Sequence, residues 1–364
     1  MSKWFRESPL VKEIPKIRKF ETKDIVRRLG FVSPSRIYLK NYPISTPVSL
    51  FNAAFHLKNE ELIRIYGRIV LGYYMYVSAI IKVDVPMDDV LSGDVSIAPY
   101  LGEIVVYPTT KYDIWGVEDP RVYEIDGKLY MTYCGRTINY FNPAIRKERT
   151  SPVTAVEVKN GTWEKILVTV LPDELREHLI SDKDAFLFKI KDEVLLFHRP
   201  HMDDEKYYLT LSRIDSRAFK EASERKGKVT EVKATNIVHV MEPAEFESKI
   251  GWATPPIEAE RGKYIVLLHG VDKEIQGYRV FAALMEYDEE WGMRVTAVTP
   301  YYIMEPKMSY EIFGDRPYVV FPCGAWRVKD KILITYGAAD TVTGIGEIDI
   351  NELMSILDKG RIEK

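Results

Sequence analysis

Cysteine is scarce in this chain, with Cys134 and Cys323 the only two among 364 residues. They form no Cys-x-x-Cys motif and supply no disulfide framework of the kind that small secreted domains depend on. We therefore expect two free thiols in a reducing cytoplasm.

Long apolar runs and an excess of one charge are also missing. No run reaches the roughly 18 apolar residues of a membrane span, and the N-terminal residues lack the apolar segment of a signal peptide. The 51 Lys and Arg residues oppose 54 Asp and Glu residues, giving a net charge of -3. This balance gives no case for nucleic acid or an anionic membrane as the main partner.

Metal and nucleotide motifs are absent as well. The six histidines include no His-x-x-x-His pair, and no glycine-rich loop of the Walker type occurs. We therefore expect no catalytic metal and no nucleotide cofactor. What is abundant is tyrosine, with 23 residues, together with Lys and Glu, a composition that favours the surface of a thermophile's protein.

A strand–turn–strand pattern recurs five times. In one copy, residues 116–125 and 128–133 flank Asp126-Gly127, a pair that tolerates the positive φ of tight hairpin turns. The turn centres are spaced 68, 65, 70 and 68 residues apart, as differences of Asn59, Gly127, Asp192, Gly262 and Asp330. Further strand-like runs, such as residues 207–211 and 280–285, would complete a four-stranded sheet in each repeat. Five such sheets predict an all-β, five-bladed β-propeller, whereas a two-domain β-sandwich would not explain a fivefold period.

This repeat divides the chain into three parts. The propeller is expected over residues 46–349. Residues 1–45 read as an irregular leader with a short helix at residues 21–29, and the leader could serve contacts in a homo-oligomer. Residues 350–364 predict a C-terminal helix capped by Asp349 or Asn351, and residues 172–180 predict one further short helix.

Polar residues stand at equivalent points of the repeats. The hairpin ends carry Arg68, Arg136, His198 with Arg199, His269 and Asp340, and the hairpin starts carry Asn52, Asp119 with Arg121, and Lys183 with Asp184. Because equivalent positions of a propeller meet at the mouth of its central tunnel, we expect these side chains to converge. Arg and Lys suit the oxygens of phosphate.

The mixture of charges favours one reaction class. Hydrolysis of a glycosidic bond usually needs two carboxyl groups, whereas phosphorolysis needs only the acid. Asp119 is the candidate acid, presented at a strand entrance by Pro120 and on the same strand face as Arg121. One good carboxylate beside a basic patch favours phosphate as the nucleophile.

Other interpretations stay open at this point. An inverting hydrolase, a non-catalytic sugar-binding propeller and a phosphorylase for a different sugar all fit the pattern. Asp119 could instead only pair with Arg121, Lys183 could be an ordinary surface lysine, and His269 could be an interior histidine with a structural hydrogen bond.

Six segments resemble glycoside hydrolase family 130, which comprises β-mannoside phosphorylases and some β-mannosidases. They occur in the family's order, at residues 116–121, 182–185, 197–200, 268–271, 310–315 and 336–340, and the likeness runs from about residue 51 to residue 349. The resemblance implies a five-bladed propeller that cleaves a β-mannoside with inversion. Inorganic phosphate would be the co-substrate, with α-mannose 1-phosphate as the product and no other cofactor.

The resemblance also implies roles for individual residues. Asp119 looks like the general acid, which in the family's phosphorylases is thought to act through a mannose hydroxyl. The residues that resemble phosphate ligands are Arg68, Lys183 and His198, with Arg136 and Arg149 as candidates for the remaining arginines. The expected substrate-binding residues are Asn52, Arg121, Arg199, His269, Tyr278 and Asp340. The segment 138–149 looks longer than is usual in the family and could reshape the subsite of the leaving sugar, whose identity stays open.

Overall fold

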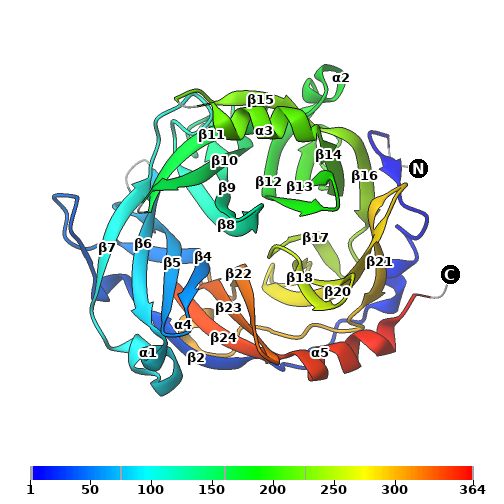
Figure 1. The fold of residues 1–364 in the computed structure, drawn as a ribbon. Coiled ribbons are helices and arrows are strands. Elements are labelled where there is room, and N and C mark those ends of the chain that lie inside the picture. Colours follow the sequence, from blue (N-terminus) through cyan, green and yellow to red (C-terminus); the bar gives the residue numbers. More distant parts are fainter. Residues whose placement is uncertain (1–2, 74–75, 160, 226, 363–364) are drawn as a thin grey trace.

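The computed structural model describes residues 3–73, 76–159, 161–225 and 227–362. Its strands form five sheets set radially around a central axis, with mostly antiparallel pairing inside each sheet (Figure 1). The prediction of an all-β, five-bladed propeller is therefore confirmed. Residues 1–2 of the predicted leader and 363–364 of the predicted C-terminal helix lie outside the described residues.

Each blade follows the chain from its innermost strand outward. Blade 1 consists of β4 (Ser49–Asn59), β5 (Leu62–Val70), β6 (Ser78–Pro86) and β7 (Tyr100–Val106). Blade 2 consists of β8 (Val117–Ile125), β9 (Lys128–Arg136), β10 (Thr150–Lys159) and β11 (Thr162–Val170), and blade 3 of β12 (Leu179–Ile190), β13 (Glu193–Met202), β14 (Leu209–Ile214) and β16 (Thr235–Met241). Blade 4 consists of β17 (Glu247–Trp252) with β18 (Ile257–Glu260), then β19 (Lys263–Asp272), β20 (Tyr278–Asp288) and β21 (Gly292–Val298), and blade 5 begins with β22 (Val320–Val328), β23 (Lys331–Ala338) and β24 (Val342–Asp349).

Local sequence explains the repeated hairpins. Asp126 and Gly127, between β8 and β9, have φ angles of 51° and 71°, as a tight hairpin turn requires. Apolar side chains on the faces of the blades are buried because they pack between neighbouring blades. One buried cluster joins blades 2, 3 and 4, a second joins blades 1, 2 and 5, and a third joins blades 4 and 5.

The predicted leader is not irregular, and this part of the prediction was wrong. Its strand β2 (Arg27–Val32) pairs antiparallel with β24 and becomes the outermost strand of blade 5, which closes the ring. Two further strands, β1 (Arg6–Glu7) and β3 (Ile37–Leu39), add parallel edges to blades 3 and 1, and β15 (Thr230–Lys233) does the same for blade 2. Residues 21–29 form no helix, because part of this segment satisfies its backbone against the exposed edge of β24.

Buried charge holds the same segment in place. The guanidinium of Arg18 donates to both carboxylate oxygens of Glu247 in blade 4, at 2.6 and 2.7 Å, and both side chains are almost fully buried. Arg28 on β2 binds Glu311 in the same way, at 3.0 Å to one oxygen. The N-terminal residues are therefore an integral part of the propeller.

The helices are few and short, as predicted. The helix α2 (Asp173–Arg176) occupies part of the predicted segment, and α5 (Ile350–Leu357) is capped by the Asp349 side chain. The predicted C-terminal helix is shorter than expected, because a 3-10 turn (Asp358–Gly360) ends it. Three helices were not predicted: α1 (Met87–Ser92), α3 (Ser216–Glu224) and α4 (Ser309–Ile312).

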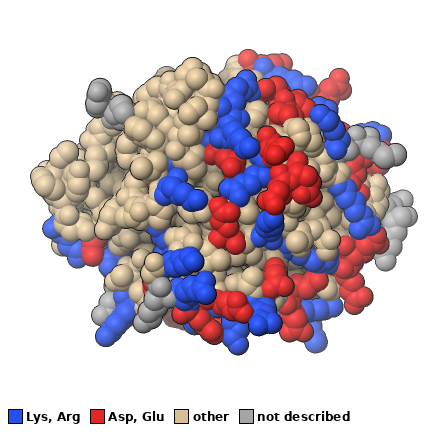
Figure 2. All heavy atoms as spheres, turned by 90° about the horizontal axis from the view of Figure 1, so that it is seen from above, with Lys and Arg blue, Asp and Glu red and all other residues tan. Residues whose placement is uncertain are grey.

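Charged residues of both signs are interspersed over one half of the face in Figure 2 and are sparse over the other half. This face carries no continuous basic patch. Within the described residues, no helix is long and apolar enough to cross a membrane.

Candidate active site

The innermost strands of blades 1, 2 and 3 share one irregularity. Their register shifts between Phe51 and Ala54, between Glu118 and Arg121, and between Lys183 and Phe186. In each bulge the first skipped residue has a positive φ, at 48° for Asn52, 52° for Asp119 and 56° for Asp184. Asn and Asp tolerate this conformation better than other side chains, and bulges commonly re-aim a side chain at a functional site.

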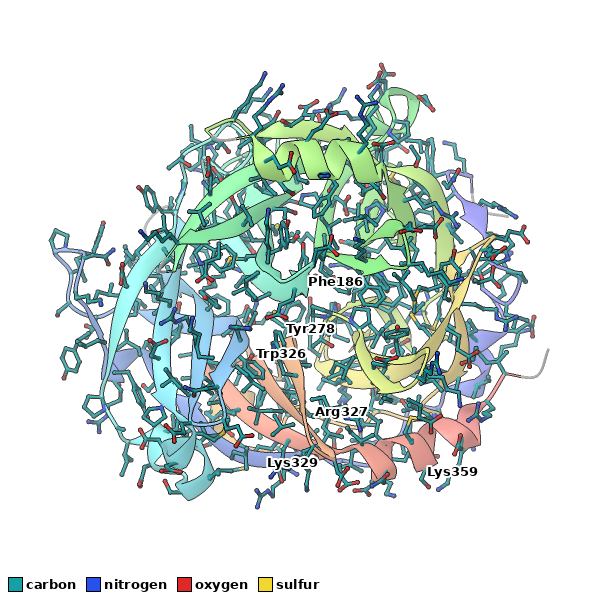
Figure 3. The ribbon with its side chains drawn as sticks, viewed as in Figure 1. Phe186, Tyr278, Trp326, Arg327, Lys329 and Lys359 are labelled. Carbon is teal, nitrogen blue, oxygen red and sulfur yellow. The ribbon has the colours of Figure 1, made fainter. Side chains whose placement is uncertain are left out.

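These three side chains line one cavity of about 280 Å³ near the propeller axis. Figure 3 shows Tyr278, another lining residue, close to that axis. The cavity contains seven of the predicted site residues: Asn52, Arg68, Asp119, Lys183, Arg199, Tyr278 and Asp340. The fivefold repeat therefore brings most of the predicted polar residues together.

Asp119 is held by three contacts. Its Oδ1 accepts hydrogen bonds from Nδ2 of Asn52 at 2.8 Å and from the guanidinium of Arg68 at 3.1 Å. Its backbone carbonyl accepts one from Arg121 at 2.8 Å. The carboxylate is thus fixed in position, yet it still faces the cavity, as an acid that acts on a bound sugar must.

Glu118, the neighbour of Asp119, gathers three cations. Its carboxylate lies 2.9 Å from Arg68, 3.2 Å from Lys183 and 3.4 Å from Arg136. Burial alone would raise the pKa of Glu118, but the charges of Arg68, Lys183 and Arg136 outweigh it and hold the pKa well below its ordinary value. Glu118 is therefore a permanent anion that positions three of the predicted phosphate ligands.

A second cavity of about 440 Å³ adjoins the first. The two share Tyr140, Ser181 and Lys183 as lining residues. Five basic side chains come together there from blades 2 and 3 and the loop between β9 and β10: Arg136, Arg146, Arg149, Lys183 and His201. Arg146 is paired with Glu205, which leaves the other four for a ligand. Both candidate arginines thus belong to this cavity.

The loop of residues 137–149 forms one wall of the second cavity. Arg149 holds the loop by donating to the backbone carbonyls of Asn142 at 2.5 Å and Ile145 at 2.6 Å. Burial, and then the neighbouring charges of Arg136 and Arg146, lower the pKa of Arg149. The loop also presents Tyr140 and Phe141, with half or more of each side chain exposed.

Three predicted site residues do not line either cavity. His198 is fully buried, with Nδ1 2.8 Å from Asp182 and Nε2 2.7 Å from Ser212. Its prediction as a phosphate ligand was wrong for this geometry, because successive residues of a strand face opposite sides and His201 is the histidine on the cavity side.

His269 and Arg121 are the other two. His269 is buried against Phe321, and burial lowers its pKa to about 3, as for an interior histidine. Neither ring nitrogen forms a hydrogen bond with a described residue, so the structural hydrogen bond of that alternative is not found. Arg121 donates to the backbone carbonyls of Trp252 and Ala253 in blade 4 and so braces the axis. The bulge at Asp119 breaks the strand alternation, so the prediction that Asp119 and Arg121 share one face was wrong.

The sequence predicted one good carboxylate beside the cations, and the cavity contains more than one. Four carboxylates line the first cavity: Glu118, Asp119, Asp184 and Asp340. Asp184 is neutralised by Arg199 at 2.6 Å and by Arg121 at 3.5 Å. Glu118 was not among the predicted site residues, and neither were five further lining residues: Tyr76, Tyr140, Tyr207, Lys249 and Arg316. The signal for Glu118 was its place beside Asp119, while the others lie outside the hairpin ends that were compared.

Burial of the Asp340 carboxylate lowers the folding stability of the protein above pH 4, and this effect can be measured. Burial raises its pKa to about 6, against opposing attraction from Arg68. The folded protein therefore binds more protons than the unfolded chain between about pH 4 and pH 6, and this group's contribution to stability falls as the pH rises through that window.

We expect Asp340→Asn to remove this cost. The variant should be more stable than the parent by about 1–3 kcal/mol above pH 7, and the difference should vanish near pH 4. Chemical denaturation at several pH values measures this, and a difference that does not change with pH would contradict it.

No group of three or more His, Cys, Asp or Glu side chains able to hold a metal ion occurs in the part of the chain that the structure describes.

Comparison with known proteins shows which family this chain resembles. Residues 16–359 match the model of glycoside hydrolase family 130, described as beta-1,4-mannooligosaccharide phosphorylase. A beta-1,2-mannobiose phosphorylase of Thermoanaerobacter sp. (strain X514) is 33% identical over 239 residues, 65% of this chain and 68% of that protein. A beta-1,4-mannooligosaccharide phosphorylase of Ruminococcus albus is 33% identical over 122 residues, 32% of this chain and 36% of that protein.

Solved structures show the same fold. The beta-1,2-mannobiose phosphorylase from Listeria innocua, solved with beta-1,2-mannobiose, superimposes with a TM-score of 0.68 at 18% identity, covering 92% of this chain and 99% of that chain. A glycosyl hydrolase from Bacteroides ovatus gives a TM-score of 0.60 at 16% identity, covering 91% and 97%. The match of the family model over nearly the whole length shows that this chain belongs to glycoside hydrolase family 130.

Proposed function

We propose that this protein is a β-mannoside phosphorylase that uses inorganic phosphate and inverts the anomeric centre to give α-mannose 1-phosphate. The observation that carries the proposal is the cluster of Arg136, Arg149, Lys183 and His201 in the cavity beside Asp119. Such a cluster suits a dianion, whereas water needs no cations to hold it. The relatives named as mannoside phosphorylases support the same reaction.

The two cavities divide the work of the reaction. The mannosyl ring would occupy the first cavity, beside Asn52, Tyr278 and Asp340, and phosphate would enter the cationic cluster of the second. A phosphate oxygen forms the new bond to the anomeric carbon as the bond to the leaving sugar oxygen breaks. The oxygen of the leaving sugar takes the proton of Asp119, either directly or through a mannose hydroxyl, so atoms and charge balance.

The leaving sugar would bind beside the aromatic side chains of the site. Tyr76 and Tyr140 line the first cavity, their ring centroids 5.6 Å apart, and Phe141 lies 5.4 Å beyond Tyr140. Aromatic faces can pack against the apolar face of a pyranose. A reverse-reaction screen with α-mannose 1-phosphate and a panel of sugars, following phosphate release, would identify the acceptor.

The reaction proposed here needs phosphate and no other cofactor. Both cysteines are buried and unbridged, which supports the prediction of a cytoplasmic protein. A homo-oligomer is compatible with this activity and can be measured by light scattering.

Turnover of β-mannosides should require phosphate. We expect no cleavage above background without phosphate, and Lys183→Ala should raise the KM for phosphate by about tenfold or more, because one charge-assisted contact is lost. Lys189→Ala is the matched control, since Lys189 pairs with Asp126 on the surface.

Equal turnover with and without phosphate would identify a hydrolase instead. In that case Lys183→Ala should leave the rate almost unchanged. A sugar-binding propeller without catalysis would show no turnover under either condition.

A further inference from the structure

Two cations of the first cavity form no salt bridge with any residue that the structure describes. Arg68, Lys183 and Arg199 each pair with a carboxylate, at 2.9, 3.2 and 2.6 Å. Lys249 and Arg316 line the same cavity, yet their side chains form no salt bridge or hydrogen bond with any other described residue. Their charge is therefore opposed only at longer range, by Asp184 for Lys249 and by Asp340 for Arg316.

Aromatic rings surround these two cations. The guanidinium of Arg316 lies 4.6 Å and the ammonium of Lys249 lies 5.6 Å from the centroid of Tyr278. The Tyr207 ring lies 5.2 Å from Lys249 and 5.0 Å from the guanidinium of Arg199. Ring faces attract cations but do not neutralise them, so Lys249 and Arg316 still have no anion in direct contact among the described residues.

The burial of Lys249 makes its positive charge unfavourable without an anion in contact. Lys249 lies half-buried on β17, whereas Arg316 is exposed at the rim between α4 and β22. Burial, together with the charges of Arg199, Arg316 and Lys183, lowers the pKa of Lys249 to about 7, and the attraction of Asp184 opposes this shift only in part. A bound oxyanion would offset both effects, whereas a neutral sugar would offset neither.

We propose that Lys249 and Arg316, flanked by Tyr207 and Tyr278, form a second oxyanion-binding subsite, separate from the cluster of Arg136, Arg149, Lys183 and His201. Its ligand is a group of the size and charge of phosphate. That group is either free phosphate or a phosphate carried by the substrate sugar, and only the second source rests on the proposed function.

Labelling of Lys249 tests the subsite without any turnover. Reductive methylation at pH 7, followed by peptide mass spectrometry, should modify Lys249 faster than the exposed Lys128. Inorganic phosphate or mannose 6-phosphate should slow the labelling of Lys249 by about fivefold or more, because a bound anion raises the pKa of Lys249 above the pH of the reaction and keeps the amine protonated. Mannose alone should have little effect.

Two variants separate this subsite from the cluster proposed to hold the reacting phosphate. Arg316→Met should abolish the protection of Lys249, and Lys183→Met should preserve it. Protection by mannose 6-phosphate alone would assign the oxyanion to the sugar, and protection by phosphate alone would assign it to the free ion. Equal protection by mannose, no protection by either anion, or loss of protection in Lys183→Met would overturn the proposal.

Discussion

Asp119→Asn should lower kcat/KM for phosphorolysis of a β-mannoside by about 10²–10⁴-fold, the usual contribution of a general acid. The change removes the proton that the leaving sugar oxygen needs and alters little else. Asn also tolerates the positive φ of this position, and its side-chain oxygen can still accept from Asn52 and Arg68. The fold and the cavity should therefore persist.

The leaving group separates loss of an acid from loss of structure. A 4-nitrophenyl β-mannoside expels an anion that needs no protonation, so Asp119→Asn should lose far less activity on it than on a disaccharide. Asp126→Asn is the matched control, because Asp126 also has a positive φ but pairs with Lys189 on the surface. Equal losses on both substrates would show that Asp119 is not the proton donor.

Local chemistry explains why the number of blades was predictable. Turn residues such as Asp126-Gly127 and alternating apolar strands are set by neighbours in sequence, so their period is visible in the chain alone. The closing strand β2 was not predictable in this way, because its partner β24 lies about three hundred residues later. Only the assembled ring presents the free edge that β2 completes.

The same distinction applies to the site. Asn52, Asp119 and Asp184 occupy equivalent bulges, so their convergence followed from the repeat. His198 and His201 lie three residues apart on β13, and choosing between them required the direction of each side chain in the folded strand. Lys249 and Arg316 lie outside the hairpin ends, where the repeat gave no signal.

Glu118→Gln should destabilise the protein by about 3–5 kcal/mol in the absence of phosphate, the usual cost of removing one member of a buried ion pair. Arg68, Arg136 and Lys183 would then repel one another without the anion that holds them. Because the pKa of Glu118 is depressed, its stabilisation is present above about pH 4.3 and is lost as the pH falls through the folded-state pKa. The difference between parent and variant should therefore shrink on strong acidification.

Phosphate distinguishes positioning of the cations from a merely structural role for Glu118. A dianion bound among Arg136, Lys183 and their neighbours replaces the missing negative charge, so phosphate should raise the Tm of Glu118→Gln by more than it raises that of the parent. A ligand at one hundred times its Kd contributes about 2.7 kcal/mol, enough for a thermal scan to resolve. Glu247→Gln is the matched control, because Glu247 is equally buried against Arg18 but does not line either cavity of the site. It should lose comparable stability without any extra response to phosphate, and an equal phosphate response in both variants would mean that Glu118 does not organise the anion site.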